Sequence, residues 1–188
     1  MSVLLCSEIL IAIYRFLPLL QNRLYMAKLY INKDIVADKD KMENWYLTGE
    51  EGLSFPDIQN FLSWIDPNDH VIDIEIHSCG GDAVEGYAIY DALRASGKQI
   101  SCTAVGRCAS MATVILLAAA KERRFAYPHA KFLIHKPYMA SYDGDLDLET
   151  LESIKSNLES EKNKMLALYV ERTGSEASVI EALSLIHI

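Results

Sequence analysis

Three short segments of the sequence contain the residue types that nucleophilic catalysis needs. Ser110 follows a β-rich segment and precedes an apolar helix, and His135 ends a short apolar strand. Histidine, with a pKa of about 6.5, is the side chain best matched to taking a proton from a serine hydroxyl near neutral pH. Gly80-Gly81 lies between a strand and a helix, where unpaired backbone N–H groups can bind an anion or a developing oxyanion.

Each of these residues also has a simpler explanation. Gly80-Gly81 can be an ordinary strand-to-helix turn, and a single histidine at a strand end is usually structural. For Ser110 taken alone, the interpretation as a helix N-cap is favoured, because Gly106-x-x-x-Ser110 is not the usual GxSxG motif. The catalytic alternative gains weight because all three segments lie at strand ends or adjoining helix starts, the edge where open α/β sheets form active sites.

The elements that must position these residues alternate between strand and helix along the chain. This alternation predicts an α/β fold with a mainly parallel sheet. Residues 106–109 are expected to form a turn between the third strand and the apolar helix. Strands are predicted at 27–31, 71–77, 100–105, 124–127 and 131–134, and helices at 57–65, from 82 to a cap at Gly97, at 110–120 and at 146–172.

Two of these helices have apolar patterns that predict which face they bury. In the helix that starts at Asp82, the buried face is predicted to be Val84, Ala88, Ala92 and Leu93. The helix of 146–172 has a narrow apolar stripe made of Leu151, Ile154, Leu158, Met165 and Leu168. Such a stripe needs a partner surface, either on the same domain or on a second subunit, and the pattern alone favours neither.

The order and spacing of the motifs resemble the Clp protease proteolytic subunit family, ClpP, and especially its phage-encoded branch. The family's Ser-Pro-Gly-Gly segment appears as Ser78-Cys79-Gly80-Gly81, with cysteine in place of proline. Its Ala-Ser-Met nucleophile motif appears as Ala109-Ser110-Met111, and its Ile-His-x-Pro motif appears as Ile134-His135-Lys136-Pro137. The resemblance covers about 28–182.

The resemblance implies a serine endopeptidase with a crotonase-like spiral of βαβ units and a projecting helical handle at 146–172. The subunits would assemble as stacked rings around a closed chamber, which favours the oligomer contact for the apolar stripe. Ser110 would attack the peptide carbonyl, with His135 as base and then acid, and no metal or cofactor is implied. The oxyanion would be held by the backbone N–H groups of Gly81 and Met111. The residues expected to bind substrate are Gly80, Gly81 and Pro137.

The two ends of the chain and the third catalytic residue depart from the family pattern. The family's catalytic acid has no match, and Glu181 lies near the expected place but too early in register. We expect a peptidase domain over 26–183, truncated at its C-terminus, preceded by an extension or an over-long start at 1–25. Residues 184–188 form an anomalous tail. Cys108, close to Ser110, is expected to be buried and inert rather than an alternative nucleophile.

Composition limits the partners. The 188 residues are 51% hydrophobic and 23% charged, which suits one globular domain, and the net charge of −8 argues against nucleic-acid binding. The apolar stretch of 3–20 is interrupted by Glu8 and Arg15, so no stable membrane insertion is expected. The four cysteines form no CxxC pair, which argues against a zinc site or a disulfide framework. We expect a cytoplasmic protein of a bacterial host, and a prophage gene is one of the origins that the resemblance allows.

Two other functions compete with the peptidase. A crotonase-fold acyl-CoA hydratase or isomerase would share the glycine oxyanion hole but would rely on carboxylates, and Glu85 is the only obvious acid near the glycines. The second alternative is a ring-forming scaffold that has lost activity, and the lack of a matched catalytic acid favours it. For the peptidase itself, the resemblance implies either unfolded proteins delivered by an ATP-dependent unfoldase or phage capsid and scaffold proteins as substrates.

Overall fold

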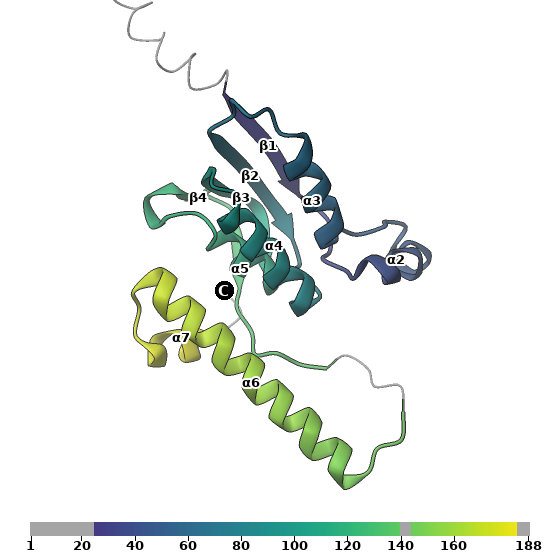
Figure 1. Ribbon diagram of the computed structural model, residues 1–188. Helices are drawn as coiled ribbons and strands as arrows, with labels where there is room; N and C mark the ends of the chain where they lie inside the picture. Colours follow the sequence, from purple (N-terminus) through teal and green to yellow (C-terminus); the bar gives the residue numbers. More distant parts are fainter. Residues whose placement is uncertain (1–24, 140–143, 184–188) are drawn as a thin grey trace, which may run out of the picture.

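Five parallel strands form the sheet on which the molecule is built (Figure 1). The structure is a computed structural model that describes residues 25–139 and 144–183. The strands are β1 (Met26–Ile31), β2 (Val71–Ser78), β3 (Gln99–Ala109), β4 (Arg124–Ala126) and β5 (Lys131–Leu133). Their order is β1-β2-β3-β4, β5 pairs with the far end of β3, and every pairing is parallel. The predicted parallel α/β sheet is confirmed.

The helices follow the strands along the chain and include the predicted handle. They are α2 (Lys41–Thr48), α3 (Phe55–Trp64), α4 (Ala83–Ala95), α5 (Met111–Leu116), α6 (Leu148–Thr173) and α7 (Ala177–Leu183), with short 3₁₀ turns η1 (Asp38–Asp40) and η2 (Lys121–Arg123). In Figure 1, α3 and α4 lie along the sheet, whereas the N-terminal part of α6 extends away from it. This arrangement is the expected βαβ spiral with a projecting helix.

The core lies between the central strands and α4, α5 and the end of α6. In β2 the alternation predicted from the sequence holds, because Ile72, Ile74 and Ile76 are fully buried while the residues between them are not. The short helix α5 is buried along five consecutive residues, Met111 to Ile115. Catalytic candidates at the start of α5 are therefore attached to the least mobile kind of structure, a packed strand and a packed helix.

The turn predicted at 106–109 is wrong, because β3 continues to Ala109. The pairing of β2 with β3 shifts register between Ile76 and Ser78, after which Ser78 pairs with Cys108. The extended end of β3 then pairs with β5. Gly106 does not form a turn. Its lack of a side chain allows the ring of His77 to approach the backbone of β3, since a Cβ at this position would lie 2.1 Å from Nδ1 of His77.

The apolar helix predicted at 110–120 is shorter than expected. α5 ends at Leu116, and the chain continues through turns in which Leu117, Ala118 and Ala119 each bond back three residues. The carbonyl oxygens of Leu117 and Ala119 accept hydrogen bonds from the guanidinium groups of Arg124 and Arg172. These long-range donors compensate the carbonyl groups that a longer helix would have paired internally.

The face predicted for α4 is also wrong in part. Val84 is 76% exposed, although Leu93 is fully buried as expected. The orientation of α4 follows from its contact with α5, because a Cβ on Gly86 would lie 2.6 Å from Cε of Met111. The residues that α4 buries are Gly86, Tyr87, Ile89, Tyr90 and Leu93.

Two predicted segments lie wholly or mostly outside the described residues. They are the N-terminal extension at 1–25, of which only Tyr25 is described, and the tail at 184–188. Within the described ranges, no helix is long and apolar enough to cross a membrane.

Candidate active site

Ser110 occupies a strained turn between β3 and α5. Its φ of 52° and ψ of −127° make it the only non-glycine residue with positive φ in the part of the chain that the structure describes. Although Ser110 stands at the N-cap position, its hydroxyl makes no capping hydrogen bond, so the N-cap interpretation is wrong. A sharp strand-to-helix turn that leaves a half-buried serine hydroxyl unused is the geometry of a nucleophile elbow.

His135 reaches the same edge of the sheet through β5. The backbone N–H of Ser110 donates to the carbonyl oxygen of Leu133 at 2.8 Å, and Ala109 pairs with Leu133 in the sheet. His135 follows two residues after Leu133. The structure thus brings the predicted nucleophile and base to the ends of neighbouring parallel strands.

Gly80 packs directly against the serine turn, and Gly81 packs against the backbone of Ile35. At Gly80, with φ of 87°, a Cβ would lie 2.7 Å from the nitrogen of Met111 and 2.7 Å from Cβ of Ser110. At Gly81, with φ of 143°, a Cβ would lie 2.0 Å from the carbonyl oxygen of Ile35. Neither position accepts a side chain without displacing backbone, so glycine is required at both.

A loop that the sequence analysis did not identify holds the glycines in place. Ile35 donates its N–H to the carbonyl oxygen of Gly80, and its own carbonyl oxygen accepts from Asp82, both at 2.8 Å. Among the described residues, no acceptor pairs with the N–H of Gly81 or with that of Met111, the first residue of α5. Two unpaired backbone donors beside a serine are what an oxyanion requires.

A backbone carbonyl selects the tautomer of the neutral His135 ring. Nδ1 of His135 lies 2.7 Å from the carbonyl oxygen of Lys136. A carbonyl oxygen only accepts, so Nδ1 holds the proton, and Nε2 of the neutral ring is left as the basic nitrogen. The ring of Tyr138 lies beside the imidazole, with 5.4 Å between the ring centroids.

One cavity joins His135 to the C-terminal helices. His135 and Pro137 line it together with Glu181 of α7 and Lys162 of α6. Lys162 pairs with Glu181 at 2.7 Å and, with a smaller contribution from Lys136, lowers the pKa of this carboxyl group. Glu181 is thus an ionised group in the cavity of His135.

The cysteines near the site differ in environment. Cys108 is fully buried, as expected, and burial raises its pKa to about 12, so it does not form a nucleophilic thiolate at neutral pH. Cys79, which replaces the family's proline, is exposed, and Nη1 of Arg107 donates to its Sγ at 3.0 Å.

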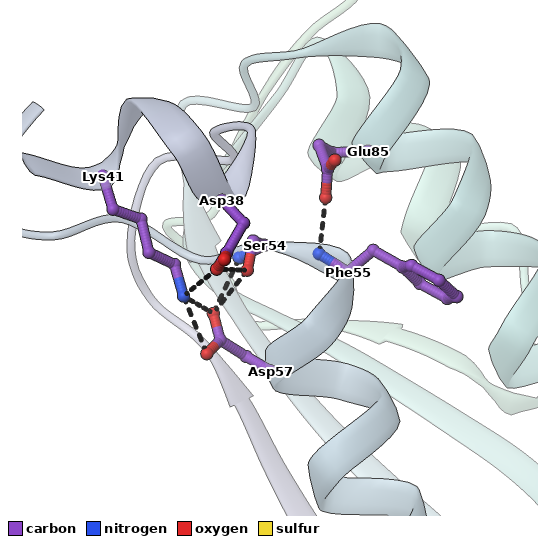
Figure 2. A network of polar contacts seen from close by, with 6 residues as sticks. All are labelled: Asp38, Lys41, Ser54, Phe55, Asp57 and Glu85. Carbon is purple, nitrogen blue, oxygen red and sulfur yellow. Dashed lines mark hydrogen bonds and ion pairs between the residues drawn. The ribbon is translucent and has the colours of Figure 1, made fainter.

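Glu85, the acid that a hydratase would need, has a structural role. Its Oε2 accepts the backbone N–H of Phe55 at 2.6 Å, at the start of α3, and in Figure 2 its carboxylate points to that N–H. The same helix start is held by Ser54 and Asp57, whose carboxylate pairs with Lys41 at 2.7 Å. Glu85 therefore caps a helix, which disfavours the hydratase alternative.

The sequence analysis missed Thr113 and Tyr169, which lie behind Ser110. Oγ1 of Thr113 donates to the carbonyl oxygen of Ser110 at 2.5 Å and also contacts the hydroxyl of Tyr169 on α6. A signal was present, because Thr113 is the only polar residue in the apolar run of 111–120.

Comparisons with known proteins identify the family. A family model described as Clp protease matches residues 57–184. Over 125 residues, the chain is 33% identical to ATP-dependent Clp protease proteolytic subunit 1 of Chlamydia muridarum. The aligned segment covers 64% of this chain and 62% of that protein. Over 128 residues, it is 37% identical to the ATP-dependent Clp protease proteolytic subunit of Porphyromonas gingivalis. This aligned segment covers 66% of this chain and 55% of that protein. The chain thus spans less than two-thirds of the length of these relatives.

A solved structure supports the same conclusion for the fold. A ClpP1 mutant from Listeria monocytogenes superimposes with a TM-score of 0.64 at 20% identity, covering 89% of this chain and 81% of that one. Because the family model matches more than half of its residues, this chain belongs to the Clp protease family.

Proposed function

We propose that the chain is a Clp-type serine endopeptidase with Ser110 as its nucleophile and His135 as its general base. The observation that carries this proposal is the strained Ser110 turn, whose hydroxyl makes no cap and which adjoins two unpaired backbone donors and the strand that precedes His135. Strain at a polar residue is retained where the surrounding structure enforces it and function uses it.

The reaction follows from the placement of these groups. Nε2 of His135 takes the proton of Ser110 as Oγ attacks the peptide carbonyl carbon. The N–H groups of Gly81 and Met111 donate to the oxyanion of the tetrahedral intermediate. Protonated His135 then donates its proton to the leaving amine, and a water molecule, deprotonated by His135, hydrolyses the acyl-enzyme.

The carbonyl oxygen of Lys136 takes over part of the work of a catalytic acid. By accepting the Nδ1 proton of His135, it holds the tautomer that leaves Nε2 free. A neutral carbonyl stabilises the imidazolium less than a carboxylate would, because it has no net charge. The proposal therefore predicts that His135, supported by the carbonyl oxygen of Lys136 alone, acts as a base but gives slow peptide hydrolysis.

The substrate-binding assignment uses the residues that flank the dyad. Gly80 and Gly81 present backbone without side chains, so an extended peptide can approach them closely. Pro137 lines the cavity of His135 and also a groove that continues along α6 past Ile154 and Leu158. A peptide chain bound between the glycines and Pro137 would place its scissile carbonyl at Ser110.

Assembly and partners extend the proposal beyond one chain. The exposed N-terminal half of α6 supports oligomerisation through the handle, with rings as the form that we propose. Relatives named ATP-dependent Clp protease proteolytic subunits support an ATP-dependent unfoldase as partner and unfolded proteins as substrates. The cytoplasmic location and the phage branch with its capsid substrates stay predictions.

Peptide hydrolysis by matched variants tests the proposal. Ser110→Ala should lower turnover of a fluorogenic peptide by at least about 1,000-fold without changing the melting temperature. Cys108→Ala is the matched control, since its buried thiol is close in sequence but inert, and it should retain activity. Equal activity of wild type and Ser110→Ala would refute the assignment. A folded wild type with no hydrolysis would favour the scaffold alternative.

A further inference from the structure

Thr113 connects the serine turn to the handle helix. Its side chain is 3% exposed, and both its N–H, at 2.9 Å, and its hydroxyl, at 2.5 Å, are bonded to the carbonyl oxygen of Ser110. Its Oγ1 also contacts the hydroxyl of Tyr169, which is 4% exposed and belongs to α6. Three oxygen atoms, two from the start of α5 and one from α6, thus meet behind Ser110.

The direction of these hydrogen bonds follows from the chemistry of the groups. The carbonyl oxygen of Ser110 can only accept, so the hydroxyl proton of Thr113 is directed to it. Oγ1 of Thr113 is then the acceptor for the hydroxyl proton of Tyr169. Burial raises the pKa of Tyr169, which keeps that proton in place near neutral pH. The chain runs from Tyr169 to Thr113 to Ser110, and each bond polarises the next.

The carbonyl group of Ser110 controls a catalytic donor. The C=O of Ser110 and the N–H of Met111 belong to one trans peptide plane, so they point in opposite directions. Fixing the carbonyl oxygen on Thr113 therefore directs the Met111 N–H away from the core. The described residues place further restraints on this turn, among them the bond from the Ser110 N–H to the carbonyl oxygen of Leu133 and the close approach of Gly80.

We propose that Thr113 and Tyr169 are positioning residues that aim the oxyanion donor of Met111, and that α6 thereby sets the reactivity of Ser110. This inference rests on the proposed serine peptidase function. Neither residue touches substrate in this scheme. Their effect is on a backbone donor whose aim matters most when the negative charge of the tetrahedral intermediate has formed.

The test removes one hydroxyl group at a time from the hydrogen-bond chain. Thr113→Val removes the hydroxyl and keeps the shape, and we expect it to lower kcat about 10-fold or more with KM changed by less than about 2-fold. Tyr169→Phe removes the more distant hydroxyl and should lower kcat by about 3-fold to 10-fold. Thr113→Ser keeps the hydroxyl and should restore most of the rate.

A peptide boronate supplies a readout that a purely structural role would not change. It forms a tetrahedral adduct on the serine and so needs the oxyanion donors, whereas a bound unreactive peptide does not. The inhibition constant of the boronate should rise in parallel with the loss of kcat in Thr113→Val and Tyr169→Phe. The affinity for the unreactive peptide should stay constant.

Tyr87 offers a matched control. Its hydroxyl is also buried, but it has no hydrogen-bond partner among the described residues, so Tyr87→Phe removes a phenol oxygen without breaking a bond. Tyr87→Phe should leave kcat and boronate binding unchanged. If Tyr169→Phe behaves like Tyr87→Phe, the inference is wrong even when the wild type is active. If the wild type neither hydrolyses peptide nor binds boronate, the proposed function itself fails, and this inference fails with it.

Discussion

The two halves of α6 have the same apolar period but different surroundings. In the C-terminal half, Met165 is 9% and Tyr169 4% exposed, and the guanidinium of Arg172 donates to carbonyl oxygens at the end of α5. In the N-terminal half, Leu148 is 81% and Leu151 48% exposed. One half is therefore packed on its own domain, and the other presents apolar side chains outward.

The difference bears on the two alternatives that the apolar stripe left open. The pattern allowed packing on the same domain or on a second subunit, and the structure shows the first for the buried half of the helix. For the exposed half, the polar bonds are local, such as the Asp147 cap on the N–H of Thr150 and the 3.9 Å pair of Lys155 with Glu159. Such exposed pairs contribute little stability, so this half is suited to a partner surface.

The largest expected contrast concerns side-chain truncation in the two halves. Met165→Ala should lower the free energy of unfolding by about 2–4 kcal/mol, because it leaves a cavity in the core. Leu148→Ala should change it by less than about 0.5 kcal/mol, because the side chain is already in water. Urea denaturation of both variants measures the contrast. Similar losses in the two variants would mean that the N-terminal half is not exposed.

A second contrast concerns charged side chains of the two halves. Arg172→Met keeps the aliphatic stem but removes the donors to Leu117 and Ala119, and should lower the free energy of unfolding by about 1–3 kcal/mol. The matched change in the exposed half is Lys155→Met, for which a change below about 0.5 kcal/mol is expected. Thermal melts of the two variants and the wild type measure both changes in stability. An unchanged Arg172→Met melt would show that Arg124 alone suffices for these carbonyl groups.

A third prediction concerns assembly, for which the exposed half is proposed. Leu151→Asp and Leu158→Asp should shift the protein to smaller species in size-exclusion chromatography with light scattering, because a charge buried at an interface without a partner is costly. The matched control is Ser156→Asp, a charge on the same helix outside the stripe. A wild-type protein that is monomeric at micromolar concentration would contradict the proposed role of the handle.

The smallest expected effect is a pH dependence at the junction of α6 and α7. Lys162 lowers the pKa of Glu181 in the folded state, so this pair adds stability above the unfolded pKa of the carboxyl group. That contribution disappears as the pH falls through the lowered folded value. The melting temperatures of wild type and Glu181→Gln should differ slightly at pH 7 and converge in acid. A constant difference across this range would contradict the assignment.

Local patterns predicted most of the strands and the common sheet edge at which the site motifs lie. The alternation in β2 and the turn residues around Gly80-Gly81 are set by neighbours in sequence, which is why the parallel sheet and the common edge of Ser110 and His135 could be expected. The family resemblance then supplied the projecting handle, and it is the source of the roles proposed for these residues and of the proposed ring.

Features that depend on distant groups could not be predicted. The end of α5 depends on donors from Arg124 and Arg172, and the buried face of α4 depends on the approach of Gly86 to Met111. The link from Thr113 to Tyr169 joins residues far apart in the chain. A one-dimensional pattern contains no information on which side chain a carbonyl group will meet.

The most direct test of the central assignment is to map the site of a fluorophosphonate adduct by tandem mass spectrometry. The account predicts one adduct per chain, on Ser110, with a rate of formation that falls strongly in His135→Ala. The His135→Ala protein should keep its melting temperature. An adduct on another residue, or no adduct on a folded wild-type protein, would contradict the assignment of Ser110 as an activated nucleophile.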